Sequence, residues 1–245
     1  MPTPIEEIKE QLKLCSSDVI KNAKIITPSD IGQDFLLHVA VKKWDEFVPN
    51  ISRRASSKED NTVPRLHTAP TILGCVRGFG IIDYLIGSKI PNDSDKDKNG
   101  DDQYSFYRGG LYIHKVNFDV AIAPNKKLVF DAPDTDETWL ITYNENTRTF
   151  PATVIGRIVL GQLTTVPRLG ELPLTTFKLF IEINDNEGIK FDDTNTLTSG
   201  YYEIDIDFQT PSVVINNSSK AVFDKQHQDK AAMLKFKEPA ACFKW

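Results

Sequence analysis

The second half of the chain is a series of short segments rich in β-branched and aromatic residues, and this series constrains the fold more than any other feature of the sequence. The segments begin at about residue 104 and are separated by Asn, Asp, Gly and Pro. They read "YSFYRGGLYIHKVNFDVAI", "KLVFDAP", "TWLITY", "ATVIGRIVLGQLTTV", "TTFKLFIEI" and "GYYEIDIDF". Such a pattern predicts strands joined by turns and loops.

The segment "YYEIDIDF" alternates apolar and polar side chains with a period of two. Successive side chains of a strand point to opposite faces of a sheet. One face would carry Tyr202, Ile204, Ile206 and Phe208, and the other Tyr201, Glu203, Asp205 and Asp207. This alternation is typical of an antiparallel sheet with one face packed and one face in water.

The first 47 residues predict helices. Pro4 suits a first helical turn, and the apolar residues after it recur at helical spacing, at Ile5, Ile8 and Leu12. The stretch "TPSDIGQDFLLHVAVKKWDEF" opens with capping residues and predicts a second helix with one apolar face, formed by Ile31, Phe35, Val39 and Trp44. A strand at "FLLHVAV" is the alternative.

The order of these patterns predicts an α+β fold, with N-terminal helices followed by a mostly antiparallel multi-strand sheet or split sheet in a single domain. A chain of 245 residues can bury such a core without disulfides. We expect an N-terminal helical segment at 1–47, a core domain at 48–216 with an acidic loop at 92–103, and a charged C-terminal tail or helix at 217–245.

Composition excludes several function classes. The formal net charge of −5 gives no strong nucleic-acid signature, and the most apolar segment, "APTILGCVRGFGIIDYLIG", is too polar for a membrane span. The three widely spaced cysteines and the charged N-terminal segment are typical of a cytoplasmic protein. The acidic run "NDSDKDKNGDD" resembles the start of a calcium loop, but Phe106 occupies the place of the final carboxylate, so we expect no metal cofactor.

Several basic and hydroxyl side chains precede the apolar segment "TILGCVRG". They lie in "NISRRASS" and "VPRLHTAPT" and comprise Arg53, Arg54, Arg65, His67 and Thr68. The start of a helix presents backbone N–H groups to anions, and arginine binds phosphate oxygens in pairs. Because "TILGCVRG" is helix-like, this stretch predicts a binding site for a pyrophosphate.

Aromatic and acidic residues follow in "FYRGGLYIH" and "DAPDTDETWLITY". Tyr107, Tyr112 and Trp139 would offer a stacking surface for a planar ring. Glu137 would stabilise positive charge that develops at a ribose carbon, as the carboxylates of glycosidases do.

In this order the residues resemble those of ADP-ribosyltransferase-fold proteins, over about residues 48 to 183. The resemblance implies that an Arg or His anchors NAD, an aromatic residue packs on nicotinamide and a Glu contacts the ribose. It implies Glu137 and His67 as catalytic residues, and NAD as a substrate bound by Arg53, Arg54, Arg65, Thr68, Tyr107 and Trp139. The chain lacks the Ser-Thr-Ser strand and the Glu-x-Glu loop of that family, so Glu182 and Glu203 stay alternatives for the catalytic carboxylate.

The expected function is NAD-dependent ADP-ribosyl transfer to a macromolecular target, as in a microbial toxin or effector. The alternative is a non-enzymatic protein that binds a protein partner through the polar sheet face and loops. In that alternative the arginines form surface ion pairs, His67 caps a helix and Trp139 is a core residue.

The pentapeptide "TVPRL" occurs twice, at 62–66 and at 165–169. The residues around the two copies do not match at the same offset, which argues against a duplicated module. Proline restricts its own backbone and that of the preceding residue. We therefore interpret both copies as extended loop pieces.

Overall fold

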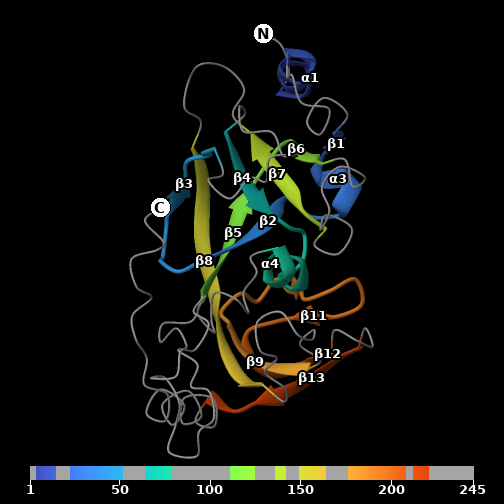
Figure 1. The fold of residues 1–245 in the computed structure, drawn as a ribbon. Coiled ribbons are helices and arrows are strands. Elements are labelled where there is room, and N and C mark those ends of the chain that lie inside the picture. Colours follow the sequence, from blue (N-terminus) through green and yellow to red (C-terminus); the bar gives the residue numbers. More distant parts are fainter. Residues whose placement is uncertain are drawn as a thin grey trace, which may run out of the picture. The chain divides into compact units, whose positions relative to one another are not determined.

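A computed structural model describes residues 4–14, 23–51, 64–78, 111–124, 136–141, 149–163, 176–207 and 212–220. In these ranges the chain is mostly β, with antiparallel strand pairs and a few short helices (Figure 1). The expected multi-strand antiparallel sheet is confirmed. The expected α+β class is wrong in its helical part, because most of the described residues after the first helix form strands, turns and loops.

The chain divides into two compact units, each assembled from separate stretches. Unit 1 contains Met1–Phe79, Ile113–Ile155 and Ile189–Thr196. Unit 2 contains Gly80–Tyr112, Gly156–Gly188 and Leu197–Trp245. Three of the described strands contribute residues to both units, namely β5 (Leu111–Asn117), β8 (Phe150–Leu163) and β11 (Thr196–Leu197).

Unit 1 contains two groups of strands. One is a four-stranded sheet with the order β1-β6-β7-β4, formed by β1 (Lys24–Ile26), β6 (Ala121–Ala123), β7 (Thr138–Ile141) and β4 (Arg65–Thr68). The other has the order β2-β5-β8, with β3 on β8, and adds β2 (Phe35–Ala40), β5 (Leu111–Asn117) and β3 (Glu46–Phe47). The remaining elements are α1 (Pro4–Leu14), α3 (Pro28–Ile31), α4 (Ile72–Gly78) and the short pair β10 (Ile189–Lys190) and β11 (Thr196–Leu197).

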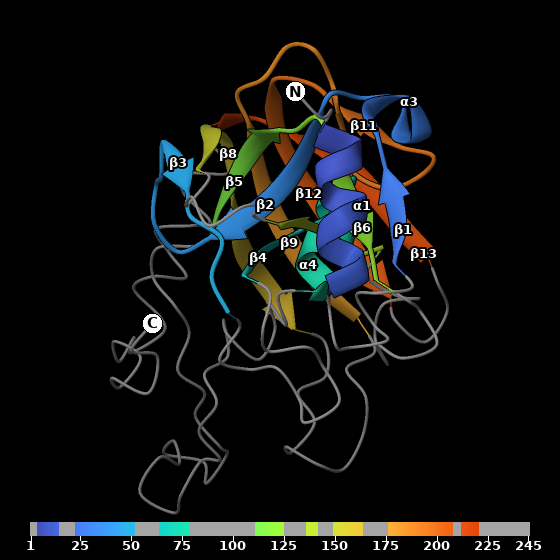
Figure 2. The same cartoon turned by 90° about the horizontal axis from the view of Figure 1, so that it is seen from above.

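The four-stranded sheet is covered on both faces. On one face, Ile8 and Leu12 of α1 pack against Trp139 and Ile141 of β7. The expectation of an amphipathic N-terminal helix is thus confirmed. Figure 2, a view from above, labels α1 together with β1 and β6 of this sheet. The other face packs against β2, β5 and β8 through a cluster that contains Ile26, Leu36, Leu66, Val116, Phe118, Ala121, Leu140 and Phe150.

The second expected helix is wrong, and the alternative strand is right. Only α3 forms, because Gly32 ends it in the left-handed conformation with φ of 68°. Thr27 and Asp30 cap its first turn. The apolar run that follows then forms β2, in which Phe35, Leu36 and Leu37 are all buried.

Unit 2 contains an antiparallel sheet with the order β8-β9-β12-β13, formed with β9 (Thr176–Ile183), β12 (Gly200–Asp207) and β13 (Ser212–Ser218). The predicted alternation of β12 is confirmed, since Tyr202, Ile204 and Ile206 are buried and the residues between them are only half-buried. The sequence did not indicate β13.

Four further expectations concern residues outside the described ranges. These are the acidic loop at 92–103, the strand at "KLVFDAP", the second "TVPRL" and the C-terminal segment from 221 onwards. In the part of the chain that the structure describes, no helix is long and apolar enough to cross a membrane.

Gly156 allows β8 and β9 to approach each other closely. It lies opposite Ile183 in the strand register, and a Cβ atom at this position would lie only 2.1 Å from the carbonyl oxygen of Glu182. A backbone atom cannot move aside as a flexible side chain can. Gly200 is different, because a Cβ there would only touch the Tyr202 ring at 3.5 Å.

We predict that Gly156→Ala destabilises the protein by about 1–3 kcal/mol, the usual range for overpacking. Gly200→Ala is the matched control, and it should be neutral or stabilise slightly, because alanine lowers the entropy of the unfolded chain. Urea unfolding followed by circular dichroism measures both. Equal stabilities of the two variants would contradict the close approach of the strands.

Candidate functional site

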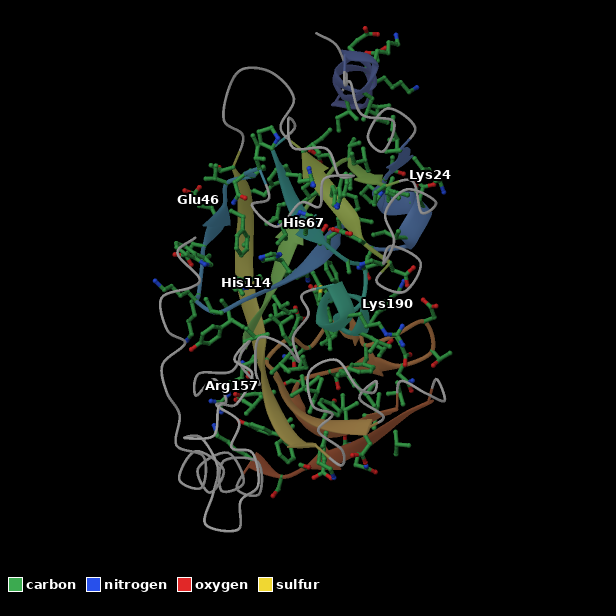
Figure 3. The ribbon with its side chains drawn as sticks, in the orientation of Figure 1. Lys24, Glu46, His67, His114, Arg157 and Lys190 are labelled. Atoms are coloured by element: carbon green, nitrogen blue, oxygen red, sulfur yellow. The ribbon has the colours of Figure 1, made fainter. Side chains whose placement is uncertain are left out.

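Four of the residues that the sequence singled out lie together on one face of the β4–β7 pair. In the antiparallel register His67 is opposite Trp139 and Arg65 is opposite Ile141. Glu137 immediately precedes β7, and alternation places its side chain on the same face as that of Trp139. Figure 3 labels His67 among the side chains of unit 1.

Glu137 is held by two donors. Its Oε1 atom contacts Nδ1 of His67 and accepts a hydrogen bond of 2.7 Å from the indole Nε1–H of Trp139. The chain enters β7 through Asp136, which has φ of 48°, a left-handed conformation that aspartate tolerates better than most residues. This turn sets the direction from which the Glu137 side chain reaches the two rings.

The surroundings of Glu137 keep it ionised. Burial alone would raise the pKa of its carboxyl group, but the hydrogen bond and charge of His67, the indole donor and the charge of Arg65 together lower it. An ionised carboxylate only accepts hydrogen bonds, so Nδ1 of His67 carries the hydrogen in this contact. In the neutral imidazole, Nε2 is then the basic nitrogen.

The His67–Glu137 pair is the part of the site that solvent reaches. The side chain of His67 is 39% exposed and that of Glu137 is 13% exposed. Nε2 of His67 is itself covered and has no hydrogen-bond partner among the described residues. A basic nitrogen beside an oriented carboxylate is the arrangement found in acid–base catalysis.

Arg65 is buried, with a relative exposure of 1%. Its guanidinium carbon lies 4.3 Å from the centre of the Trp139 ring, which places the cation on the aromatic face. Because β4 begins at Arg65, the interpretation of the first "TVPRL" as an extended loop is wrong from Arg65 onwards. The packing also leaves Arg65 no open side from which to bind a phosphate group.

Trp139 has no exposed surface, because α1 covers it. The alternative in which it is a core residue therefore fits the structure better than a stacking role. Thr68 points to the opposite face of β4, where its hydroxyl donates to the carbonyl of Thr138 at 2.9 Å. Arg53, Arg54 and Tyr107 lie outside the described residues.

The segment after Thr68 forms a helix, as its helix-like pattern indicated, but its N-terminus is already occupied. The N–H of Gly74 donates to the hydroxyl of Thr71 at 3.0 Å, and the N–H of Leu73 donates to the carbonyl of Phe191 at 2.8 Å. With these donors paired inside the protein, the start of α4 offers no pyrophosphate site of the kind that the sequence predicted.

His38 is a neighbour of the site that sequence reasoning missed. Its Nδ1 lies 2.7 Å from the backbone carbonyl of His67 and donates to it. The outer edge of β4 is otherwise bonded to Asn50 at Arg65 and to Leu37 at Ala69. His38 therefore supplies a hydrogen-bond donor to this edge of β4 at His67, the residue whose Nε2 is the basic nitrogen. A polar residue within the apolar "FLLHVA" was the available signal, but the helix expected there concealed it.

A second histidine lies close to His38. The ring of His114 is fully buried, and its Nε2 accepts the backbone N–H of Trp44 at 3.1 Å. The ring of Phe47 makes edge contacts with both histidines, at centroid distances of 4.6 Å and 5.0 Å. Burial, followed by the charges of His114 and His67, lowers the pKa of His38 to about 4, against the opposing effect of the His67 carbonyl.

The two alternative carboxylates belong to unit 2 and already have partners. Glu182 binds the guanidinium of Arg157, which Figure 3 labels on β8, and accepts the hydroxyl of Tyr201 at 2.7 Å. Glu203 binds Lys178. The first pair joins β8 to β9 and the second joins β9 to β12, so both carboxylates are engaged between neighbouring strands.

Cys75 is not a nucleophile in this structure. It is buried, its thiol donates to the carbonyl of Leu37 at 3.1 Å, and burial raises its pKa to about 12. In the described ranges, no group of three or more His, Cys, Asp and Glu side chains is arranged to hold a metal ion.

We predict that the protein loses up to about 3 kcal/mol of stability between pH 6.5 and pH 4 through His38 alone. In this window the unfolded chain binds a proton at this histidine and the folded chain does not, so stability falls as the pH falls. His38→Asn keeps a donor for the His67 carbonyl but does not titrate.

Urea unfolding at a series of pH values tests this prediction. The variant should show a shallower loss of stability below pH 6.5, and above pH 7.5 the difference between the two proteins should no longer depend on pH. Parallel curves over the whole range would show that His38 is not buried as a neutral group.

No protein-family model, characterised protein or solved structure matches the chain. The resemblance to ADP-ribosyltransferase-fold proteins therefore stays an interpretation of residue order alone. The function proposed for the chain depends on the contacts of His67 and Glu137 described above.

Proposed function

We propose that the chain is a group-transfer enzyme in which His67 acts as the acid–base group and Glu137 orients it. The observation that carries the proposal is the contact between Nδ1 of His67 and the carboxylate of Glu137. This contact fixes the tautomer and leaves Nε2 as the nitrogen that exchanges a proton with substrate, once the atoms that cover it in this structure move aside. The specific reaction that we propose is transfer of ADP-ribose from NAD to a macromolecular target.

The pair suits the second half of such a transfer. The bond between the ribose carbon and the nicotinamide nitrogen breaks, and nicotinamide leaves as a neutral molecule. A hydroxyl or amine of the target forms a new bond to that carbon and releases a proton. Nε2 of His67 accepts the proton, and the carboxylate of Glu137 stabilises the imidazolium that results.

The contacts revise the roles expected for the other residues. Arg65 and Trp139 are packed against each other, so in this proposal they support Glu137 and do not touch the substrate. The charge of Arg65 contributes to the lowered pKa of Glu137. Binding of the pyrophosphate is assigned to Arg53 and Arg54, the other two arginines that the sequence pattern indicated.

We predict that the protein releases nicotinamide from NAD and that NAD and ADP-ribose raise its melting temperature, since a ligand of the native state stabilises it. His67→Gln should lower the rate of nicotinamide release by about 100-fold or more, the usual contribution of a general base. Glu137→Gln should lower the same rate. Glu203→Gln is the matched control, because it neutralises a paired carboxylate of unit 2.

Two measurements separate the parts of the proposal. If NAD is neither consumed nor bound, the donor is wrong, and the alternative of a protein that binds a partner through its polar sheet face is favoured. Nitrogen-15 NMR of the neutral His67 ring tests the pair independently of NAD, because the ring signals report which nitrogen carries the hydrogen. Nδ1 should carry it in the parent chain, and Glu137→Leu, which removes the acceptor, should abolish this preference. The same tautomer in both proteins would show that the pair does not form.

A further inference from the structure

Among the described residues, the outer edge of β13 is a long strand edge without a partner strand. β13 is the last strand of its sheet, and among the described residues nothing pairs with its outer side. Its sequence, "SVVINNS", contains three β-branched aliphatic residues, no charge and no proline. Such an edge is a template for another strand, and proteins that keep an edge free usually shorten it or place charges or proline on it. Figure 1 shows β13 beside β12 at this end of the sheet.

The two edge strands of the four-stranded sheet in unit 1, β4 and β1, are covered or short. The outer side of β4 is bonded to Asn50 at Arg65 and to Leu37 at Ala69. The opposite edge of the same sheet is β1, which has only three residues and begins with the exposed Lys24. Both edges of this sheet are thus covered or short, whereas β13 has seven residues and no cover in the part of the chain that the structure describes.

Side-chain burial also indicates that the sheet continues beyond β13. Val213 lies opposite Ile206, and Ile215 lies opposite Ile204. Ile204 and Ile206 have no exposed surface, yet Val213 and Ile215 on the same face are only half-buried. A further strand would complete the cover of these two side chains. On the other face, Val214 is 53% exposed.

The strand is complementary to itself under a two-fold axis through Ile215. An antiparallel copy in this register places Ile215 opposite its equivalent, Val214 opposite Asn216 and Val213 opposite Asn217. Side chains that meet in this way share a face of the sheet. Apolar groups therefore meet apolar or amide groups, and no charged residue faces another across the new pair.

The nearest charges are too far from the axis to repel. Asp205 and Glu203 lie on β12, one strand further from the axis. Across the axis they are three strand spacings from their equivalents, about 14 Å. This exceeds the screening length of about 8 Å at physiological ionic strength. Both are also near Lys178, which binds Glu203 and lies 3.5 Å from Asp205.

From these observations we propose that a second copy of this chain pairs antiparallel with β13, on a two-fold axis at Ile215, and joins two sheets of unit 2 into one. The pairing is independent of the chemistry proposed for His67. It supplies main-chain hydrogen bonds to the edge and covers Val213 and Ile215.

Cysteine cross-linking tests the register. In a chain with Cys15→Ser and Cys242→Ser, Ile215→Cys places two thiols directly opposite each other. Cα atoms in that position are about 4.5–5.5 Å apart, which suits a disulfide. Val213→Cys is the matched control, since its Cα atoms would be about 14 Å apart. With diamide as oxidant, we expect a covalent dimer from Ile215→Cys and little from Val213→Cys. Equal cross-linking of both variants, or none of either, overturns the proposal.

Sedimentation velocity over a range of protein concentrations tests the dimer without a cross-link. The double variant Val214→Lys/Asn216→Lys places each lysine across from Asp205 or Glu203 within its own sheet, which favours the fold of the single chain. Across the axis the same lysines face each other, so the dimer dissociation constant should rise roughly tenfold or more at low salt.

The neutral double variant Val214→Thr/Asn216→Ser is the control, and it should dimerise as the parent chain does. Melting temperatures of all three proteins show whether the sheet itself remains folded. A parent chain that stays monomeric at every concentration, or a lysine variant that dimerises equally well, contradicts the proposal.

Discussion

The antiparallel pairing of β4 with β7 is the constraint on which the rest of unit 1 depends. With His67 opposite Trp139, side-chain alternation sends Leu66 and Leu140 into the core beneath the sheet. It sends Arg65, His67 and Trp139 to the other face. A slip of the strand register by one residue would exchange the two sets of side chains between the faces of the sheet. The packed core and the polar site would then both be lost. The stability of the core therefore fixes the geometry of the site.

The polar face of this pair shows how a protein keeps charges within a largely apolar layer. Arg65 is almost fully buried, and its cation rests on the face of Trp139. The same indole donates its N–H to Glu137, so one ring serves both a positive and a negative group. Buried charges are tolerated when each has an oriented partner. Trp139 is thus the structural centre of the arrangement, and His67 is the member with access to solvent.

Local patterns predict β5, β7, β8, β9 and β12, because their β-branched and aromatic runs and the alternation of β12 can be read directly from the sequence. Of the site residues that the sequence indicated, His67, Glu137, Arg65 and Trp139 lie on one face of β4 and β7, whereas Thr68 points to the other face. The roles of these residues do not follow from local patterns. Whether Arg65 faces solvent or an indole depends on α1, whose covering of Trp139 is a long-range contact. The same applies to His38, since its bond to the His67 carbonyl joins two strands far apart in the sequence. The helix expected over 27–47 failed because the run after Gly32 satisfies both a helical and a strand pattern, and burial on both sides of β2 decided between them.

The interleaved composition of the two units also determines when the chain can fold during synthesis. Unit 1 needs residues 113–155 and 189–196 in addition to the first 79, and unit 2 takes up the stretches between them and the rest of the chain. Neither unit is a continuous piece that a ribosome can release and let fold by itself. Both depend on contacts between residues distant in sequence, which slow folding and prolong the exposure of unpaired strands. For a nascent chain of this kind, the time before residue 196 emerges is the period in which chaperones are most needed.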